Sequence, residues 1–138
     1  MRYEEWSAVE GAKILIVEDH PTMREAMRLV LEGEGFTIEE AADGQAALEM
    51  VRAEPPDLVF LDMNIPGSSG AEVLAAVRAD PETEDVRVII VTADGEEGRE
   101  RAMSMGADEY FTKPFSPITL LRTVEQVLSA PRPPEPEA

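Results

Sequence analysis

Four consecutive apolar residues that end on a carboxylate, Leu58-Val59-Phe60-Leu61-Asp62, constrain the fold of this chain more than any other stretch. The run is too short to span a membrane and is typical of a strand buried on both faces. Strands of this kind occur in parallel sheets, because helices cover both faces of such sheets. The run therefore predicts a central parallel strand that carries Asp62 to one edge of a sheet.

The same pattern occurs twice more along the chain. Ile14-Leu15-Ile16-Val17 leads into Glu18-Asp19, and Val88-Ile89-Ile90-Val91 leads into Thr92. The carboxyl ends of neighbouring parallel strands meet at one edge, where open α/β sheets bind their ligands. We therefore expect three carboxylates and one hydroxyl to converge there.

Segments with helical spacing of apolar residues follow each predicted strand. This βα repeat favours an α/β fold, in which a parallel sheet with right-handed crossovers carries helices on both faces. The strands are predicted at Lys13–Val17, 36–41, Leu58–Asp62, Arg87–Thr92 and Glu109–Thr112.

Two of the predicted helices need comment. The helix at about 96–105 is expected to be weak, because Gly95 and Gly98 lie near its start and its apolar face is small. The last helix is expected to begin at Ser116-Pro117, a suitable cap followed by a suitable first residue. Its inward face is predicted to consist of Ile118, Leu121, Val124 and Leu128.

Length and charge limit the class of protein. The 138 residues suffice for one domain, which we expect at 12–129, between an extension at 1–11 and a tail rich in proline and glutamate at 130–138. The net charge of −17 argues against binding to nucleic acid or an anionic membrane surface. The chain has no cysteine, no signal-like apolar core and no segment of membrane-spanning length, so we expect a cytoplasmic protein.

The predicted edge has the groups that phosphoryl transfer requires. Two carboxylates about 5 Å apart repel by roughly 3 kcal/mol at an effective dielectric near 20, so the acids Glu18, Asp19 and Asp62 need a cation. Oxygen ligands with room for water favour Mg²⁺. Lys113, just past the fifth strand, and Thr92 are suited to bind phosphoryl oxygens while Asp62 attacks phosphorus and forms an acyl phosphate.

Each of these residues also has a simpler interpretation. An acid after a buried strand is often a solvated loop residue, and Glu18-Asp19 could complement a helix dipole. Thr92 fits any strand, Lys113 could be an ordinary surface lysine, and His20, the single histidine, is interpreted as a loop residue near the site. The shared position at strand ends is what favours a common function.

With these motifs assembled, residues 12–129 closely resemble the receiver domain of bacterial two-component response regulators, of which the chemotaxis regulators are examples. The motifs that carry the resemblance are Ile14-Leu15-Ile16-Val17-Glu18-Asp19, Ala41-Ala42-Asp43-Gly44-Gln45-Ala46-Ala47-Leu48, Asp62-Met63-Asn64-Ile65-Pro66-Gly67-Ser68-Ser69-Gly70, Val91-Thr92-Ala93 and the stretch from Gly106 to Phe115.

The resemblance implies a flavodoxin-like sheet of five parallel strands in the order 2-1-3-4-5, with five helices on its two faces, as in chemotaxis receivers. It implies that Asp62 accepts a phosphoryl group from a phosphohistidine, and that Thr92 and Lys113 bind the phosphoryl oxygens. It also implies a Mg²⁺ site formed by Glu18, Asp19, Asp62 and the backbone carbonyl of Asn64.

The resemblance further implies a switch. Tyr110 would be its aromatic residue, coupled to Thr92, and would change the face formed by the fourth helix, fifth strand and fifth helix. Asn64 and Asp94, each two residues past a site residue, would tune autodephosphorylation. A cis peptide is expected at Lys113-Pro114. Ser68-Ser69 replaces the apolar and acidic or amide residues that are more usual in that loop, which is expected to alter kinase or partner recognition.

We therefore expect a phosphorylation-controlled signalling switch that catalyses only its own phosphorylation and dephosphorylation. The expected partners are a sensor histidine kinase or phosphotransfer protein and a downstream protein target, with no direct binding to nucleic acid or membrane. The expected oligomeric state is a monomer or a phosphorylation-dependent dimer.

Two other functions compete with this one. A hydrolase or mutase of the haloacid dehalogenase type also uses a strand-end aspartate and Mg²⁺, but it needs an acid two residues later, where this chain has Asn64. A binding module that works without phosphorylation would not need Asp62, Thr92 and Lys113 together.

Overall fold

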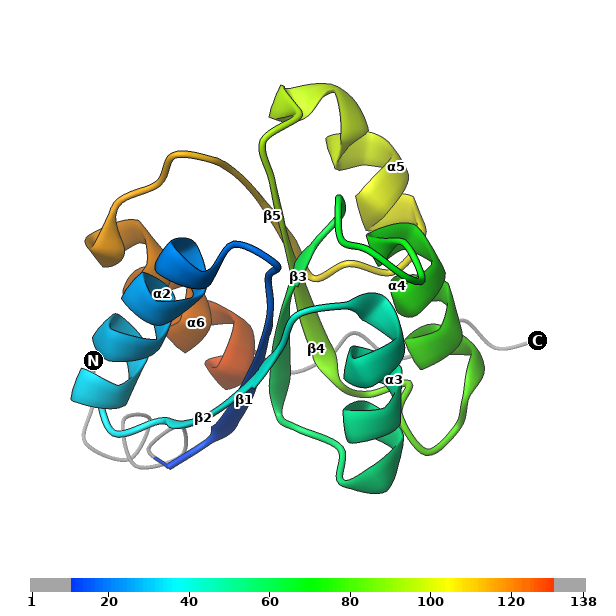
Figure 1. The fold of residues 1–138 in the computed structure, drawn as a ribbon, viewed down its shortest axis with the longest axis horizontal. Coiled ribbons are helices and arrows are strands. Elements are labelled where there is room, and N and C mark those ends of the chain that lie inside the picture. Colours follow the sequence, from blue (N-terminus) through cyan, green and yellow to red (C-terminus); the bar gives the residue numbers. More distant parts are fainter. Residues whose placement is uncertain (1–10, 131–138) are drawn as a thin grey trace.

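Residues 11–130 of the computed structural model are described, and they form one parallel sheet between two layers of helices (Figure 1). Most of the predicted extension at 1–11 and tail at 130–138 lies outside these residues, so both boundaries stay predictions.

The five strands confirm the predicted topology. Their order in the sheet is β2-β1-β3-β4-β5, and every neighbouring pair is parallel. In the register, Val17 pairs with Leu61 and Asp62 pairs with Val91, so the strands end at nearly the same level. The bounds are β1 Lys13–Val17, β2 Thr37–Ala41, β3 Leu58–Asp62, β4 Arg87–Thr92 and β5 Glu109–Thr112.

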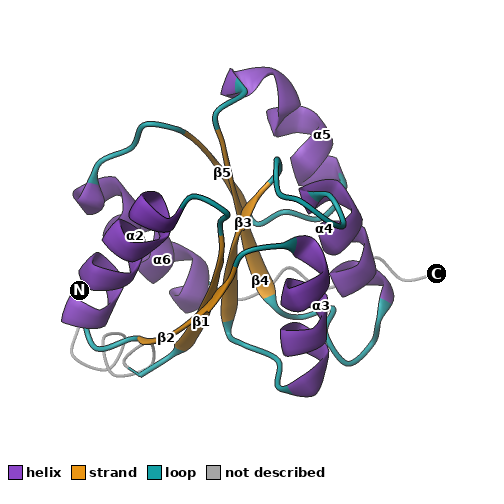
Figure 2. Ribbon diagram, in the orientation of Figure 1, coloured by secondary structure: helices purple, strands orange, loops and turns teal. Residues whose placement is uncertain are grey.

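Helices cover both faces of the sheet, as predicted. Figure 2 shows α2 and α6 on one side and α3, α4 and α5 on the other. The bounds are α2 Pro21–Gly33, α3 Gly44–Ala53, α4 Gly70–Ala79, α5 Arg99–Ser104 and α6 Pro117–Ser129, with a 3-10 turn, η1, at Gly95–Gly98.

The sheet separates two hydrophobic cores. All five residues of β3 are buried, and they alternate between the two sides, as a strand geometry requires. Val59 and Leu61 pack with the α3, α4 and α5 layer, whereas Leu58 and Phe60 pack with the α2 and α6 layer. Burial of each such side chain contributes about 1.5–3 kcal/mol to the stability of the fold. The four-residue apolar run therefore correctly predicted a strand buried on both faces.

The segment after β4 forms little regular helix, as we predicted from Gly95 and Gly98. Instead of one helix at 96–105, the chain forms the turn η1 followed by the six-residue α5, in which Ala102 is the buried residue. Gly95 has a φ of +75°, a conformation that glycine adopts easily. Few buried contacts therefore hold this segment against the sheet.

The predicted inward face of the last helix is partly wrong. Ile118 is 62% exposed, whereas Leu120, Val124 and Val127 are buried. The predicted and the observed set both have helical spacing, so the sequence pattern does not decide which side of the helix faces the core. In the structure, the side that contains Leu120 packs against the sheet. Among residues 11–130, no helix is long and apolar enough to cross a membrane.

Candidate functional site

The strand ends bring the predicted site residues to one edge of the sheet. Glu18 follows β1, Asp62 ends β3, Thr92 ends β4 and Lys113 follows β5. The amide of Lys113 donates a 2.8 Å hydrogen bond to the carbonyl of Thr92, which fixes the last two strand ends to each other. The Lys113-Pro114 peptide is cis, as predicted.

The start of α4 packs directly against the backbone at Asp62. A Cβ atom on Gly70 would lie 2.5 Å from the Cα of Met63 and 2.6 Å from the carbonyl oxygen of Asp62. Both atoms belong to the backbone and cannot move aside easily. Glycine is required at position 70 because the helix approaches the site so closely.

Three carboxylates form the centre of the site. Glu18 is 2% exposed and Asp62 5% exposed, and Asp19 is half-buried. One oxygen of each side chain lies within 4.8 Å of the others. Among the side chains that the structure describes, Oε2 of Glu18 is the buried polar atom without a hydrogen-bond partner. A buried carboxylate oxygen without a partner, beside two further acids, fits a hard divalent cation such as Mg²⁺.

Lys113 compensates part of this negative charge. Its Nζ lies 2.5 Å from Oε1 of Glu18 and 2.8 Å from Oδ2 of Asp62. Because all three groups are largely shielded from water, these ion pairs are stronger than pairs on the surface. The ammonium group therefore lies beside the carboxylates of both acids.

The environment moves the three pKa values in different directions. Burial raises the pKa of Glu18, and its interaction with Asp62 raises it further. Burial opposes ionisation of Asp62 as well, but Glu18, Lys113 and the amide of Asn64 outweigh it and lower the pKa of Asp62. Burial would lower the pKa of Lys113, yet the two acids outweigh burial and raise it. The lowered pKa favours the ionised form of Asp62.

Two loops beside Asp62 are joined by Asn64 and Asp94. The amide of Asn64 donates to Oδ1 of Asp62 at 2.9 Å, and the amide of Asp94 donates to Oγ1 of Thr92 at 3.1 Å. The side-chain amide of Asn64 then donates to Oδ2 of Asp94 at 2.7 Å. The two residues predicted to tune dephosphorylation therefore contact each other.

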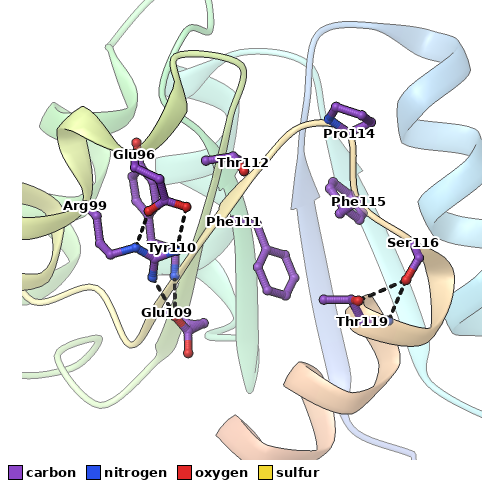
Figure 3. A pocket seen from close by; sticks show the side chains of 10 residues that line it. All are labelled: Glu96, Arg99, Glu109, Tyr110, Phe111, Thr112, Pro114, Phe115, Ser116 and Thr119. Carbon is purple, nitrogen blue, oxygen red and sulfur yellow. Dashed lines mark hydrogen bonds and ion pairs between the residues drawn. The ribbon is translucent and has the colours of Figure 1, made fainter.

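Tyr110 is buried between β5 and η1. It is 2% exposed, and its hydroxyl donates to the carbonyl of Gly95 at 2.7 Å. The guanidinium of Arg99 lies 5.1 Å from the ring centroid and pairs with Glu96 and Glu109 (Figure 3). This arrangement borders an open hollow of about 590 Å³ between η1 and the start of α6.

Sequence reasoning missed Arg24. Its NH1 donates to the carbonyl of Glu18 at 2.7 Å, and its Nε pairs with Glu40 at 3.3 Å. A basic residue in the first turns of the helix after Glu18-Asp19 could have indicated a contact with this loop. The contact of Arg24 with Glu40 could not be predicted in this way, because it depends on the pairing of β2 with β1. His20, predicted to be a loop residue, is exposed and directly precedes α2.

Comparison with known proteins agrees with this geometry. Residues 14–125 match the family model of the response regulator receiver domain. The phosphate regulon transcriptional regulatory protein PhoB of Escherichia coli (strain K12) is 40% identical over 117 residues, which are 84% of this chain and 51% of PhoB. The DNA-binding response regulator MtrA of Mycolicibacterium smegmatis is 39% identical over 113 residues, 81% of this chain and 48% of MtrA. The chain thus spans about half the length of these relatives.

A solved structure supports both the fold and the metal site. The receiver domain of the sensor histidine kinase PA1611 from Pseudomonas aeruginosa PAO1 superposes with a TM-score of 0.80 and is 26% identical. The comparison covers 87% of this chain and 99% of that domain, and a magnesium ion is coordinated in the active-site cleft of that structure.

One prediction must be corrected. From the net charge of −17 we expected no direct binding to nucleic acid, but MtrA is a DNA-binding response regulator and PhoB a transcriptional regulatory protein. The charge argument considered 138 residues alone, and these relatives are about twice as long as the matched segment. The prediction is withdrawn.

Proposed function

The chain belongs to the response regulator receiver family and is a phosphoacceptor switch of two-component signalling, and on this basis we propose that Asp62 is the phosphorylated residue. The observation that carries the proposal is the convergence of Glu18, Asp19 and Asp62 on one point beside the ammonium group of Lys113. A hydrolase of the haloacid dehalogenase type is disfavoured, since Asn64 stands where that mechanism needs an acid.

The proposed reaction transfers a phosphoryl group from the phosphohistidine of a sensor kinase or phosphotransfer protein. A carboxylate oxygen of Asp62 attacks phosphorus, the P–N bond to the imidazole breaks, and the leaving nitrogen keeps the electron pair and takes up a proton. Lys113 and the hydroxyl of Thr92 bind the phosphoryl oxygens, so positive charge and a donor lie where negative charge develops. The low pKa of Asp62 ensures that the attacking oxygen is ionised.

We assign the cation ligands to Glu18, Asp19, Asp62 and the backbone carbonyl of Asn64. When bound, Mg²⁺ neutralises charge on the phosphoryl oxygens. Support comes from the unpartnered Oε2 of Glu18 and from the magnesium ion in the PA1611 receiver. Glu18 and Asp19 supply negative charge that attracts the cation, while Lys113 compensates the charge of Glu18 and Asp62 when no cation is bound.

Dephosphorylation is proposed to be self-catalysed. Asn64 and Asp94 both lie beside Asp62 and carry groups able to hold a water molecule. Their hydrogen bond uses one N–H of Asn64 and one oxygen of Asp94, and the remaining amide and carboxylate groups are able to orient water. The pair is therefore proposed to set the lifetime of the phosphorylated form.

The switch is proposed to involve Thr92 and Tyr110 and to act on the face formed by α5, β5 and α6. The Thr92 hydroxyl accepts from the amide of Asp94, and its own proton would be donated to a phosphoryl group on Asp62, which would draw the side chain toward that group. Tyr110 is already buried, so phosphorylation would shift the population of this state rather than create it. The weakly packed η1 and α5 are suited to such a change.

The test is phosphotransfer to wild type and to Asp62→Asn, followed by ³¹P NMR and intact mass. The expected result is one added phosphoryl group in wild type with Mg²⁺ and none in the variant. Glu49→Gln, an exposed acid on α3, is the control for loss of one negative charge and should be phosphorylated normally. Turnover of excess substrate by wild type would instead support the hydrolase.

The names of PhoB and MtrA support control of transcription as the output. In cells, Asp62→Asn should then abolish the signal-dependent change in transcript levels. A signalling response that persists with unchanged transcripts would favour another output.

A further inference from the structure

We propose that Arg24 is a positioning residue for cation binding, which it supports by holding the backbone of Glu18-Asp19. This proposal rests on the assignment of Glu18 and Asp19 as cation ligands. Arg24 lies in α2, and its guanidinium cannot be a ligand because it is positively charged and has no acceptor atom. It acts through the main chain of the loop that carries the ligands.

The backbone of Glu18 is held on both sides. Its amide donates to the carbonyl of Ala41 at 3.1 Å, which continues the pairing of β1 with β2. Its carbonyl accepts the 2.7 Å hydrogen bond from NH1 of Arg24. The peptide group after Glu18 joins both proposed ligands, so rotation of that peptide would move Asp19 relative to Glu18. The guanidinium restricts this rotation.

The guanidinium is itself held in place by β2. Nε of Arg24 pairs with Oε1 of Glu40 at 3.3 Å, and both side chains are about three-quarters buried. The other oxygen of Glu40 pairs with NH1 of Arg28 at 2.8 Å. Glu40 therefore holds Nε of Arg24. Because the guanidinium is planar and rigid, NH1 then stays directed at the carbonyl of Glu18.

Charge and positioning predict opposite effects on cation affinity. Arg24 carries a positive charge beside the acidic cluster, so a purely electrostatic role would oppose Mg²⁺, and its removal would strengthen Mg²⁺ binding. If Arg24 positions the ligands, its removal weakens binding. The sign of the change therefore decides between the two roles.

The chain offers a matched control on the same helix. Arg28 lies one turn after Arg24, has the same charge and pairs with the same Glu40, but its described hydrogen bonds go to Glu32 and Glu40 and not to the loop. Arg28→Gln therefore removes the same charge without releasing the carbonyl of Glu18.

The experiment is a titration of the full chain with MgCl₂, followed by ¹⁵N NMR at backbone amides, for wild type, Arg24→Gln, Arg24→Lys and Arg28→Gln. Loss of a residue that holds a metal ligand in place costs about 10–100-fold in metal affinity, and we expect roughly a tenfold weaker affinity for Arg24→Gln. Arg24→Lys keeps the charge but lacks the fork, so it should also weaken binding, by a smaller factor. Arg28→Gln should bind as wild type or more tightly.

Unchanged or tighter Mg²⁺ binding by Arg24→Gln would overturn the proposal. If Arg24→Gln does not fold, as judged by its NMR spectrum, Arg24→Lys decides, and wild-type affinity in that variant would refute the role. Failure of wild type to bind Mg²⁺ would instead refute the ligand assignment itself. Amide hydrogen exchange at Asp19, measured without Mg²⁺, should be faster in Arg24→Gln than in Arg28→Gln.

Discussion

The side-chain amide of Asn64 donates a 2.7 Å hydrogen bond to Oδ2 of Asp94, although the two residues are 30 positions apart. This contact joins the loop after β3 to the loop after β4. Each residue also orders its own loop, since its amide donates to Asp62 or to Thr92. Any event that separates the pair alters both loops together.

The contact predicts that Asn64 and Asp94 do not act independently. Asn64→Ala and Asp94→Ala should each lengthen the life of the phosphorylated form, because each removes a group proposed to hold water. In the double variant, the increase in lifetime should be smaller than the product of the two single increases. The expected shortfall is about 0.5–1.5 kcal/mol, or roughly 2- to 10-fold. Decay of the acyl phosphate measures all three. Strictly multiplicative effects would show that the bond has no kinetic role.

Removal of the Lys113 charge should destabilise the chain in the absence of Mg²⁺. Lys113→Met leaves Glu18 and Asp62 buried without their common counter-charge. A fully buried pair would cost 3–5 kcal/mol, and partial exposure of Lys113 reduces our expectation to about 1–3 kcal/mol in urea unfolding. Added Mg²⁺ should restore part of this loss. Equal stability of variant and wild type without Mg²⁺ would contradict the compensating role.

Mg²⁺ affinity should depend on pH through Glu18. Burial raises the pKa of this carboxyl, so it keeps its proton to a higher pH than an ordinary glutamate does. A proton and the cation compete for the same oxygens. Affinity should therefore fall as the pH is lowered toward the raised pKa of Glu18, and level off above it. In Glu18→Gln the affinity should be lower than in wild type above the raised pKa of Glu18 and converge with it below that pKa, so this part of the pH dependence should disappear.

The close packing at Gly70 predicts an unusually damaging alanine substitution. In Gly70→Ala, the new Cβ meets backbone atoms of Met63 and Asp62 within 2.6 Å, so α4 must move away from the site. We expect a loss of about 1–3 kcal/mol and slower phosphorylation of Asp62. Gly33→Ala is the control, because nothing lies within 4 Å of a Cβ there. Its unfolding midpoint should stay equal or rise.

The hydroxyl of Tyr110 should stabilise the turn η1. Tyr110→Phe removes the hydrogen bond to the carbonyl of Gly95, worth about 0.5–1.5 kcal/mol, while the ring stays in place. Phosphorylation should be unaffected, and hydrogen exchange at 95–99 should become faster. Thr123→Val, at a buried position on α6, is the comparison for loss of a hydroxyl elsewhere and should leave exchange at 95–99 unchanged.

Most of the fold followed from local patterns. The apolar runs before Asp62 and Thr92 identified central strands, because only strands buried on both faces need such runs. The convergence of Glu18, Asp62 and Lys113 followed in turn, since parallel strands place their carboxyl ends at one edge. These features depend on strand direction and not on details of packing.

The remainder depended on contacts between distant elements. Ile118 and Leu120 lie on alternative helical faces of similar apolarity, and only the position of the sheet selects one. The role inferred for Arg24 required the neighbouring strand to bring Glu40 beside it. Likewise, the bond between Asn64 and Asp94 exists because two loops from adjacent strands meet, which no spacing along the chain records.

The sheet divides the interior into two cores, and this division affects how substitutions can accumulate in the sequence. Side chains behind α2 and α6 do not share a packing environment with those behind α3, α4 and α5, so a change of volume on one side is not transmitted directly to the other. Substitutions drawn from opposite sides should therefore combine additively. Substitutions in one helical layer can therefore accumulate while the other layer and the acidic groups at the common edge of the sheet stay unchanged.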